Sequence, residues 1–165
     1  ALLASHGANC PDVLSGTRID SLLNLHPAPP QLATALAVVG SRASTGYGEA
    51  IARELGAGLV GRGWTVVSGA AYGIDAASHQ GALTGDGPAI AVLPCGPERA
   101  YPEGNRRLAA VAERGVVITE LATGTVAMRH RFLARNRIIA ALSGATVVVE
   151  AGLRSGSRNT GLWRN

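Results

Sequence analysis

Four arginines fall within nine residues of this sequence, and no acidic residue stands among them. They are Arg129, Arg131, Arg135 and Arg137, with Phe132 inside the cluster. Guanidinium groups this close together repel one another, so an anionic ligand would relieve a real electrostatic cost. Cations that follow a phosphate backbone, beside a flat ring on which a base can stack, typically bind a single nucleic-acid strand. The alternative interpretation is a solvated start of a helix, with Phe132 packed into the core.

Small residues at three further places could supply backbone N–H groups and hydroxyls to a phosphate. They occupy positions 40–48, 68–70 and 155–157, and each group comes after a run of apolar residues. Turns of this kind suit a phosphate when they precede the N-terminus of a helix. Each turn alone is equally compatible with an ordinary connection, in which Arg42 lies in solvent. The residues that we select from these turns are Ser41, Arg42, Ser44, Ser68, Gly69, Ala70, Ser155, Gly156 and Ser157.

Three other polar residues are better suited to order loops than to catalyse a reaction. Asp75 could accept hydrogen bonds from loop amides, and His79 follows it by four residues. Without a nucleophile beside them, Asp75 and His79 do not form a catalytic triad, so we favour a structural polar pair. Glu150 ends the last apolar run, where its carboxylate could orient Arg42 or order a loop.

The histidines and cysteines predict neither a metal site nor a disulfide framework. The four histidines are scattered through the chain, at His6, His26, His79 and His130. The two cysteines, Cys10 and Cys95, do not form a CxxC pair. We interpret them as free thiols in a reducing compartment and expect Cys95 to be a small buried residue.

All fifteen basic residues are arginine, and the sequence contains no lysine. Within this chain, that excludes a Walker A loop, a pyridoxal-phosphate Schiff base and hydrolases that use a lysine base. A net charge of +4 is compatible with a nucleic-acid or phosphate partner. No apolar run approaches the roughly 20 residues that span a bilayer, and no signal peptide precedes the domain. We therefore expect a cytoplasmic protein without membrane contact.

From Leu36 onward, short apolar runs alternate with helical stretches, and these elements must position the candidate residues. The predicted strands are Leu36–Gly40, Trp64–Ser68, Ala89–Leu93, Val116–Thr119 and Ala145–Glu150. The predicted helices are Tyr47–Arg62, Ala71–Leu83, Gly104–Arg114 and Phe132–Ser143. Because the strands are continuously apolar rather than alternating, we expect them to be buried on both faces, as in a parallel sheet.

Repeated strand–helix units predict an α/β fold, namely a Rossmann-like, doubly wound, mainly parallel sheet with helices on both faces. Residues 1–34 lack a clear period, and we interpret them as an N-terminal lead-in segment with a short helix near Ile19–Leu25. Residues 35–165 form the predicted core. Ligands of such sheets bind beyond the carboxyl ends of the strands. The small-residue turns and the arginine cluster therefore converge on one edge of the sheet, which favours a multiply charged anion.

Four groups of residues carry a more specific signal because of their order along the chain. They are Gly40-Ser41-Arg42 with Tyr47-Gly48, Ser68 to Asp75 with His79, Arg135-Asn136-Arg137 with Ile138 to Ser143, and Glu150-Ala151 with Ser155-Gly156-Ser157 and Thr160. Together they resemble the core of the DprA/Smf family over roughly Leu36 to Thr160. The resemblance implies a non-catalytic protein that binds single-stranded DNA in a basic pocket and needs no cofactor. It also implies protection of incoming DNA and loading of the recombinase RecA during natural transformation.

The same resemblance implies roles for single residues. Arg42 corresponds to the pocket arginine of the family, and Arg129 and Phe132 correspond to its basic residue and its base-stacking phenylalanine. Asn136 joins the DNA-binding set between its two neighbouring arginines. The sequence departs from many relatives at Pro88, where they carry a lysine. It also stops before the last helix and strand of the family fold, so we expect a truncated core and leave its homodimer and RecA contacts open.

Two other function classes share this fold. A phosphoribohydrolase resembling the LOG family would show a Pro-Gly-Gly-x-Gly-Thr motif followed by a glutamate, whereas this chain has Ala-Gly-Leu-Arg-Ser-Gly-Ser at residues 151–157. Release of base from nucleoside monophosphates, lost on substitution of Glu120 or Glu150, would favour that class. A small-ligand or nucleotide carrier stays open, because a fold alone does not determine function.

Overall fold

Six β-strands form one sheet in the order β1-β5-β4-β3-β2-β6 in the computed structural model, which describes residues 21–24, 34–97, 106–152, 156 and 160. The strands are β1 (Ser21–Asn24), β2 (Ala35–Val39), β3 (Thr65–Ser68), β4 (Ala89–Val92), β5 (Val116–Thr119) and β6 (Ala145–Val148). The five strands from β2 to β6 pair in parallel, whereas β1 pairs antiparallel with β5. Parallel neighbours need crossover connections, which the helices supply.

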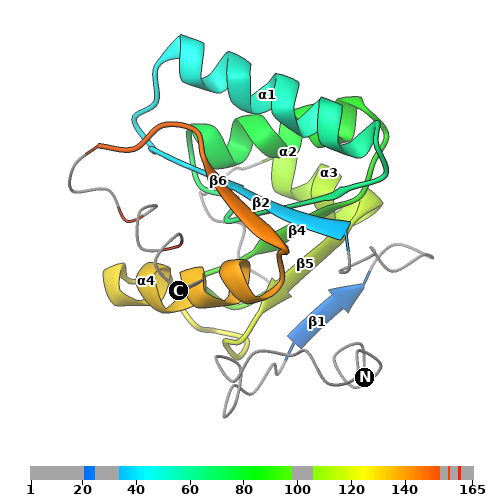
Figure 1. Ribbon diagram of the computed structural model, residues 1–165. Helices are drawn as coiled ribbons and strands as arrows, with labels where there is room; N and C mark the ends of the chain where they lie inside the picture. Colours follow the sequence, from blue (N-terminus) through cyan, green and yellow to red (C-terminus); the bar gives the residue numbers. More distant parts are fainter. Residues whose placement is uncertain (1–20, 25–33, 98–105, 153–155, 157–159, 161–165) are drawn as a thin grey trace.

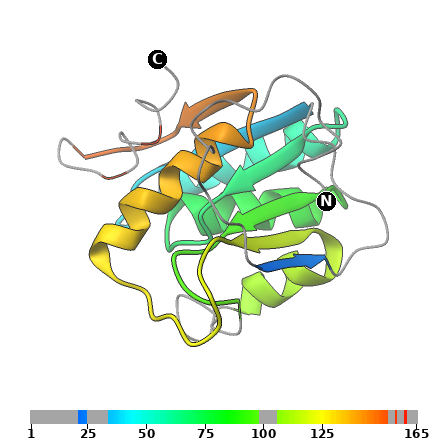
Figure 2. The same cartoon turned by 90° about the horizontal axis from the view of Figure 1, so that it is seen from below.

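The helices divide between the two faces of the sheet (Figures 1 and 2). They are α1 (Gly46–Val60), α2 (Ile74–Thr84), α3 (Arg106–Arg114) and α4 (Arg129–Ala141). The first three cover one face, and α4 crosses the other face alone. Two apolar clusters match this division, one containing Val60, Ile74 and Val111, the other containing Ile138 and Ile139. The predicted doubly wound, mainly parallel fold with helices on both faces is thereby confirmed.

Burial of the strands follows their place in the sheet. Every residue of β3, β4 and β5 is buried, as their continuously apolar sequences predict. In β6 no residue is fully buried, and Val148 is 37% exposed. Among the described strands β6 pairs only with β2, so it lies at an edge of the sheet. Position in the sheet, more than residue type, therefore determines how far each apolar run is covered.

Helices α1 and α2 pack closely because glycines face each other between them. A Cβ atom on Gly56 would lie 2.3 Å from the carbonyl oxygen of Ser78, and one on Gly81 would lie 2.0 Å from that of Arg53. No side chain fits at either position, so the two backbones are in direct contact. This contact fixes the N-terminal ends of both helices beside the carboxyl ends of β2 and β3.

The main sequence prediction that the structure overturns is the helix near Ile19–Leu25. Residues Ser21–Asn24 form strand β1 instead, in register with Val116–Thr119 of β5. The edge of β5 offers unpaired backbone groups, and pairing with them outweighs the local preference of a leucine-rich stretch. The other elements are confirmed with shifted ends, since α2 begins at Ile74 rather than Ala71 and α4 begins at Arg129 rather than Phe132. The extent of the core over residues 35–165 stays a prediction.

Candidate nucleic-acid interface

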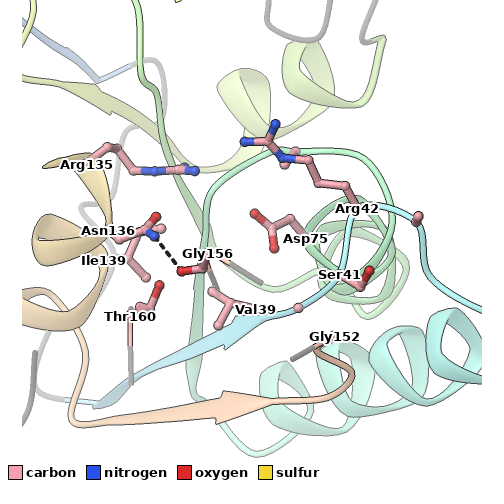
Figure 3. A pocket seen from close by; sticks show the side chains of 13 residues that line it. Val39, Ser41, Arg42, Asp75, Arg135, Asn136, Ile139, Gly152, Gly156 and Thr160 are labelled. Atoms are coloured by element: carbon pink, nitrogen blue, oxygen red, sulfur yellow. Dashed lines mark hydrogen bonds between the residues drawn. The ribbon is translucent and has the colours of Figure 1, made fainter. Parts of the chain in front are cut away.

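A cavity of about 440 Å³ opens at the carboxyl end of the sheet (Figure 3). Three strand ends contribute to it, because β2, β3 and β6 are adjacent. Residues that line it come from the β2–α1 loop, from the start of α2, from α4 and from the chain after β6, and include Gly40, Ser41, Arg42, Ala71, Asp75, Arg135, Asn136, Gly152, Gly156 and Thr160. This is the edge at which sheets of this kind bind ligands.

Two guanidinium groups enter this cavity from opposite sides. Arg42 comes from the loop after β2 and Arg135 from α4, and their side chains point toward one another in Figure 3. Arg42 is exposed, whereas Arg135 is only 4% exposed. Burial lowers the pKa of Arg135 to about 10, the Asp75 carboxylate opposes that shift, and the charge of Arg42 adds to it. With a pKa of about 10, Arg135 still carries a positive charge at neutral pH, so two guanidinium groups favour an anion in the cavity.

The Arg135 guanidinium lies against the backbone of the β3–α2 loop. A Cβ atom on Gly69 would be 2.1 Å from Nη1 of Arg135, so only glycine leaves room for this group. Nη1 donates to the carbonyl oxygen of Val92 at the end of β4. The buried Nε has no acceptor among the described residues. A buried charged donor without an acceptor is costly, which makes the cavity wall an unusual place for this arginine unless it serves a ligand.

Asp75 holds the two loops that form one wall of the cavity. Its Oδ2 atom accepts a hydrogen bond from the N–H of Gly69 at 3.1 Å, and the N–H groups of Ala71 and Gly40 also bond to its carboxylate. Burial raises the pKa of Asp75, and the nearby Arg135 charge and these three N–H groups oppose the shift. The carboxylate therefore joins the end of β2 to the start of α2.

Glu150 binds the β2–α1 loop, which carries Arg42. Its carboxylate accepts from the N–H of Thr45 at 3.1 and 3.2 Å and from the Thr45 hydroxyl at 2.9 Å. Its backbone carbonyl accepts from the N–H of Ser41 at 2.6 Å. A Cβ atom on Gly48 would be 2.1 Å from Oε2 of Glu150, so glycine at that position lets the carboxylate approach α1. The chain after β6 is thus tied to the loop after β2.

Phe132 lies beside the cavity under the exposed arginine. The guanidinium carbon of Arg42 is 4.2 Å from the centre of the Phe132 ring, a cation–π contact. Phe132 is partly buried, and Arg129 is exposed at the first residue of α4. The structure therefore brings the predicted pocket arginine and the predicted stacking ring together, although they are far apart in the sequence.

Other residues selected from the sequence are held away from the cavity. Arg137 forms an ion pair with Glu120, so the arginine cluster has an acidic neighbour that the local sequence does not reveal. The Ser44 hydroxyl donates to Glu49 at 2.9 Å, and the fully buried Ser68 hydroxyl donates to the Val38 carbonyl at 2.6 Å. These three residues do not line the cavity, and their polar groups bind partners inside the protein.

His79 is buried below this site rather than in it. Its Nε2–H donates to the carbonyl oxygen of Ile90 at 3.3 Å, which joins α2 to β4. Burial lowers the pKa of His79 to about 4, so the ring is neutral at pH 7. Cys95 is buried in the core, as predicted. The backbone of the buried pair Gly69 and Ala70 forms the loop above, with Ala70 in the left-handed region at φ 55°.

On the C-terminal side of the site, Asn136 contacts the chain after β6. Its Nδ2 group donates to the carbonyl oxygen of Gly156 at 3.1 Å, and both residues line the cavity. Ser155 and Ser157 lie outside the described residues, as does Cys10. The set of site residues selected from the sequence leaves out seven lining residues, namely Val39, Gly40, Ala43, Ala71, Ile139, Gly152 and Thr160. Gly152 follows strand β6, so the rule that ligands bind beyond the carboxyl ends of strands could have found it. Nothing in the sequence distinguishes Ile139 from a core residue.

Among the described residues that line the cavity, one is acidic, Asp75. No group of three histidine, cysteine or acidic side chains anywhere in the described chain could hold a metal ion. Glu120 and Glu150 do not line the cavity, since one pairs with Arg137 and the other with Thr45. No helix of the described part is long and apolar enough to cross a membrane.

Comparisons with known proteins agree with this arrangement. Residues 26–163 match the family model for DNA recombination-mediator protein A. A putative DNA processing protein DprA of Mycobacterium tuberculosis is 53% identical over 130 residues, which cover 78% of this chain and 33% of that protein. This chain therefore spans about a third of the length of that curated relative.

Two solved structures of DNA processing protein A share the fold. The Streptococcus pneumoniae protein is 39% identical with a TM-score of 0.72, and the match covers 76% of this chain and 44% of that one. The Helicobacter pylori protein is 28% identical with a TM-score of 0.74, and the match covers 86% of this chain and 70% of that one. The latter structure was described for its unique mode of binding single-stranded DNA.

Proposed function

Because this chain belongs to the DNA recombination-mediator protein A family, we propose that it binds single-stranded DNA in the cavity between α4 and the β2–α1 loop. The observation that carries the proposal is the approach of Arg42 and Arg135 to one cavity from opposite sides. A phosphate between them would separate two like charges and neutralise part of each. The binding mode described for the Helicobacter pylori relative supports the same ligand.

We assign a separate task to each part of the site. Arg42 and Arg135 bind a phosphate, and the loop amides beside Ser41 offer further donors to its oxygens. Phe132 stacks on a base, with Arg42 moving from the ring to the phosphate when DNA binds. Contacts to phosphates and to the faces of bases read little sequence, so binding is largely independent of sequence.

The test is the salt dependence of binding to labelled single-stranded and double-stranded oligonucleotides. For a single strand, the logarithm of the binding constant falls against the logarithm of salt concentration by about 0.7 for each neutralised phosphate. Arg42→Ala should weaken binding and reduce this slope. Arg62→Ala is the matched control, because Arg62 lies at the other end of α1 and donates to the carbonyl of Gly58. Equal binding by wild type and Arg42→Ala at all salt concentrations would remove the cavity as the DNA site.

We extend the proposal to the role that the family description names, recombination mediation. The bound strand is protected and passed to the recombinase RecA, as the resemblance to DprA/Smf proteins implies. Co-purification with RecA, and faster RecA assembly on strands coated with single-strand binding protein, would support this step. DNA binding without any effect on RecA assembly would leave the cavity proposal intact and remove the mediator role from this part of the protein.

The proposed function is binding without chemistry. Incubation with nucleoside monophosphates or with labelled DNA should release no base and no cleaved strand. Turnover that disappears in Glu120→Gln or Glu150→Gln would instead assign a catalytic role, and the phosphoribohydrolase class would then explain the fold better.

A further inference from the structure

We propose that Tyr47 and Tyr72 form a second contact surface for single-stranded DNA, on which bases stack as the strand leaves the cavity. The inference rests on the proposed function, because it concerns the nucleotides next to those held by Arg42 and Arg135. Tyr47 is 78% exposed and Tyr72 is 60% exposed, more than any other large apolar side chain of the described residues. Tyrosine combines a broad apolar ring with a polar hydroxyl and is enriched where proteins contact their partners.

Tyr72 lies on the rim of the cavity. The preceding residue, Ala71, lines the cavity, and the following residue, Gly73, packs on the β2–α1 loop. A Cβ atom on Gly73 would be 2.3 Å from the carbonyl oxygen of Ser41, and the φ angle of Gly73 is +74°. Only glycine combines that backbone conformation with such an approach. Tyr72 therefore projects from the contact between the two loops that carry the site.

Tyr47 is the second residue of α1, directly after the β2–α1 loop. The Thr45 hydroxyl caps the helix by accepting from the N–H of Gly48 at 3.1 Å, and the carboxylate of Glu150 holds Thr45 in turn. Gly48 is buried against Glu150, so the backbone on both sides of Tyr47 is fixed while its ring remains in solvent. Fixed backbone under an exposed ring is what a preorganised stacking platform requires.

The charges on this side of the rim favour bases over phosphates. Two carboxylates lie at the start of α1, namely Glu49, which accepts from Ser44 and pairs with Arg53 at 3.5 Å, and Glu150, which accepts from Thr45. They would repel a phosphate backbone, whereas the Arg42 guanidinium, which lies over the Phe132 ring, and Arg129 and Arg135 of α4 attract one. A strand that places its phosphates toward α4 turns its bases toward the tyrosines. Base stacking on aromatic rings tolerates any sequence, which agrees with sequence-independent binding.

The experiment compares oligonucleotides of two lengths, one short enough to fill only the cavity and one several nucleotides longer. Tyr47→Ala and Tyr72→Ala should each weaken binding of the longer strand by about 5- to 150-fold and leave the shorter one unchanged. Tyr→Phe at either position should bind like wild type, whereas Tyr→Leu should bind like alanine, because leucine keeps apolar area but has no ring. The salt slope should stay constant throughout. Thr84→Ala, at the exposed C-terminal end of α2, is the control.

A second measurement uses wild-type protein, so that no variant needs to fold. Iodouracil placed at successive positions of the longer strand should crosslink to Tyr47 and Tyr72 on illumination, and peptide mapping would identify them. Crosslinks confined to α4, or alanine variants that bind both strands as wild type does, would overturn the inference while leaving the cavity proposal in place. Loss of recombinase contact with unchanged DNA binding would assign the tyrosines to a protein partner instead. A wild-type protein that binds neither strand would remove the proposed function itself.

Discussion

The two walls of the cavity are built in different ways. The loop wall, formed by the turns after β2 and β3, is held by two carboxylates, those of Asp75 and Glu150, that bind backbone N–H groups. The helix wall, formed by α4, carries arginines and the Phe132 ring. Arg135 belongs to the helix wall but is buried against the loop wall, at Gly69. The comparison teaches that the loop wall fixes the shape of the site and adds the exposed Arg42, whereas the helix wall supplies the buried Arg135 and the Phe132 ring.

This division predicts different outcomes for substitutions in the two walls. Changes to the two carboxylates of the loop wall should appear first in the free energy of unfolding, since these groups bind other parts of the protein. Changes to Arg42 and to the side chains of the helix wall should appear in DNA affinity. A variant that changes DNA affinity where a loss of unfolding free energy is expected, or the reverse, would contradict this division.

The largest effect is expected for Asp75→Ala in the loop wall. The substitution leaves three backbone N–H groups without their acceptor. It also removes the negative charge that partly offsets the positive charge of Arg135. Removing one partner from a buried charged group costs about 3–5 kcal/mol in unfolding free energy. Denaturant unfolding measures this value, with Asp86→Ala as control, because Asp86 forms an exposed ion pair with Arg114. A change of the same small size in both variants would contradict the structural role assigned to Asp75.

A pH effect of similar size is expected from His79, beneath the loop wall. Its pKa is about 4 in the folded protein and 6.5 in the unfolded chain, so the folded state binds fewer protons between these values. The stability that His79 contributes is therefore present above pH 6.5 and is lost as the pH falls to about 4. The difference of about 2.5 pKa units corresponds to about 3 kcal/mol. Unfolding measured across this range should show the loss in wild type and a smaller loss in His79→Gln; parallel curves would contradict it.

For the helix wall, Phe132→Ala should weaken binding of single-stranded DNA by about 1–3 kcal/mol with an unchanged salt slope. The ring contributes stacking and carries no charge, so no counterion release depends on it. Unfolding free energy should fall less than in Asp75→Ala, because Phe132 is only partly buried. A variant that binds DNA normally would place the stacking ring elsewhere.

The smallest effect is expected for Arg137, whose charge is shared with Glu120. Arg137→Ala should reduce the salt slope by less than Arg42→Ala does, that is, by less than about 0.7. Glu120→Gln tests the same point from the other side, since it removes the negative charge beside the guanidinium and should strengthen binding. Equal slopes for Arg42→Ala and Arg137→Ala would show that the ion pair does not limit Arg137.

Much of the fold could be predicted from the sequence because its signals are local. Apolar runs and glycine-bounded helices placed the parallel strands from β2 to β6 to within two residues at each end. Strand β1 could not be predicted in this way, since Ser21–Asn24 form a strand only because the edge of β5 accepts them. The rule that ligands bind after strand ends selected Ser41, Arg42 and Gly156, and all three residues line the cavity.

The parts of the site that could not be predicted depend on contacts between distant residues. Nothing near Arg137 in the sequence indicates its pairing with Glu120, and nothing near Ser68 indicates that its hydroxyl donates to Val38. Position 69 requires glycine because the Arg135 guanidinium lies against it, and these two residues are far apart in the sequence. Residue types therefore predict a ligand class, whereas tertiary contacts determine which arginines line the cavity.

The most direct test of the account is a crystal structure of this chain with a bound single-stranded oligonucleotide. The account predicts a phosphate group between the guanidinium groups of Arg42 and Arg135, within hydrogen-bond distance of both. An oligonucleotide bound on another surface, with the cavity at the carboxyl end of the sheet left empty, would contradict it.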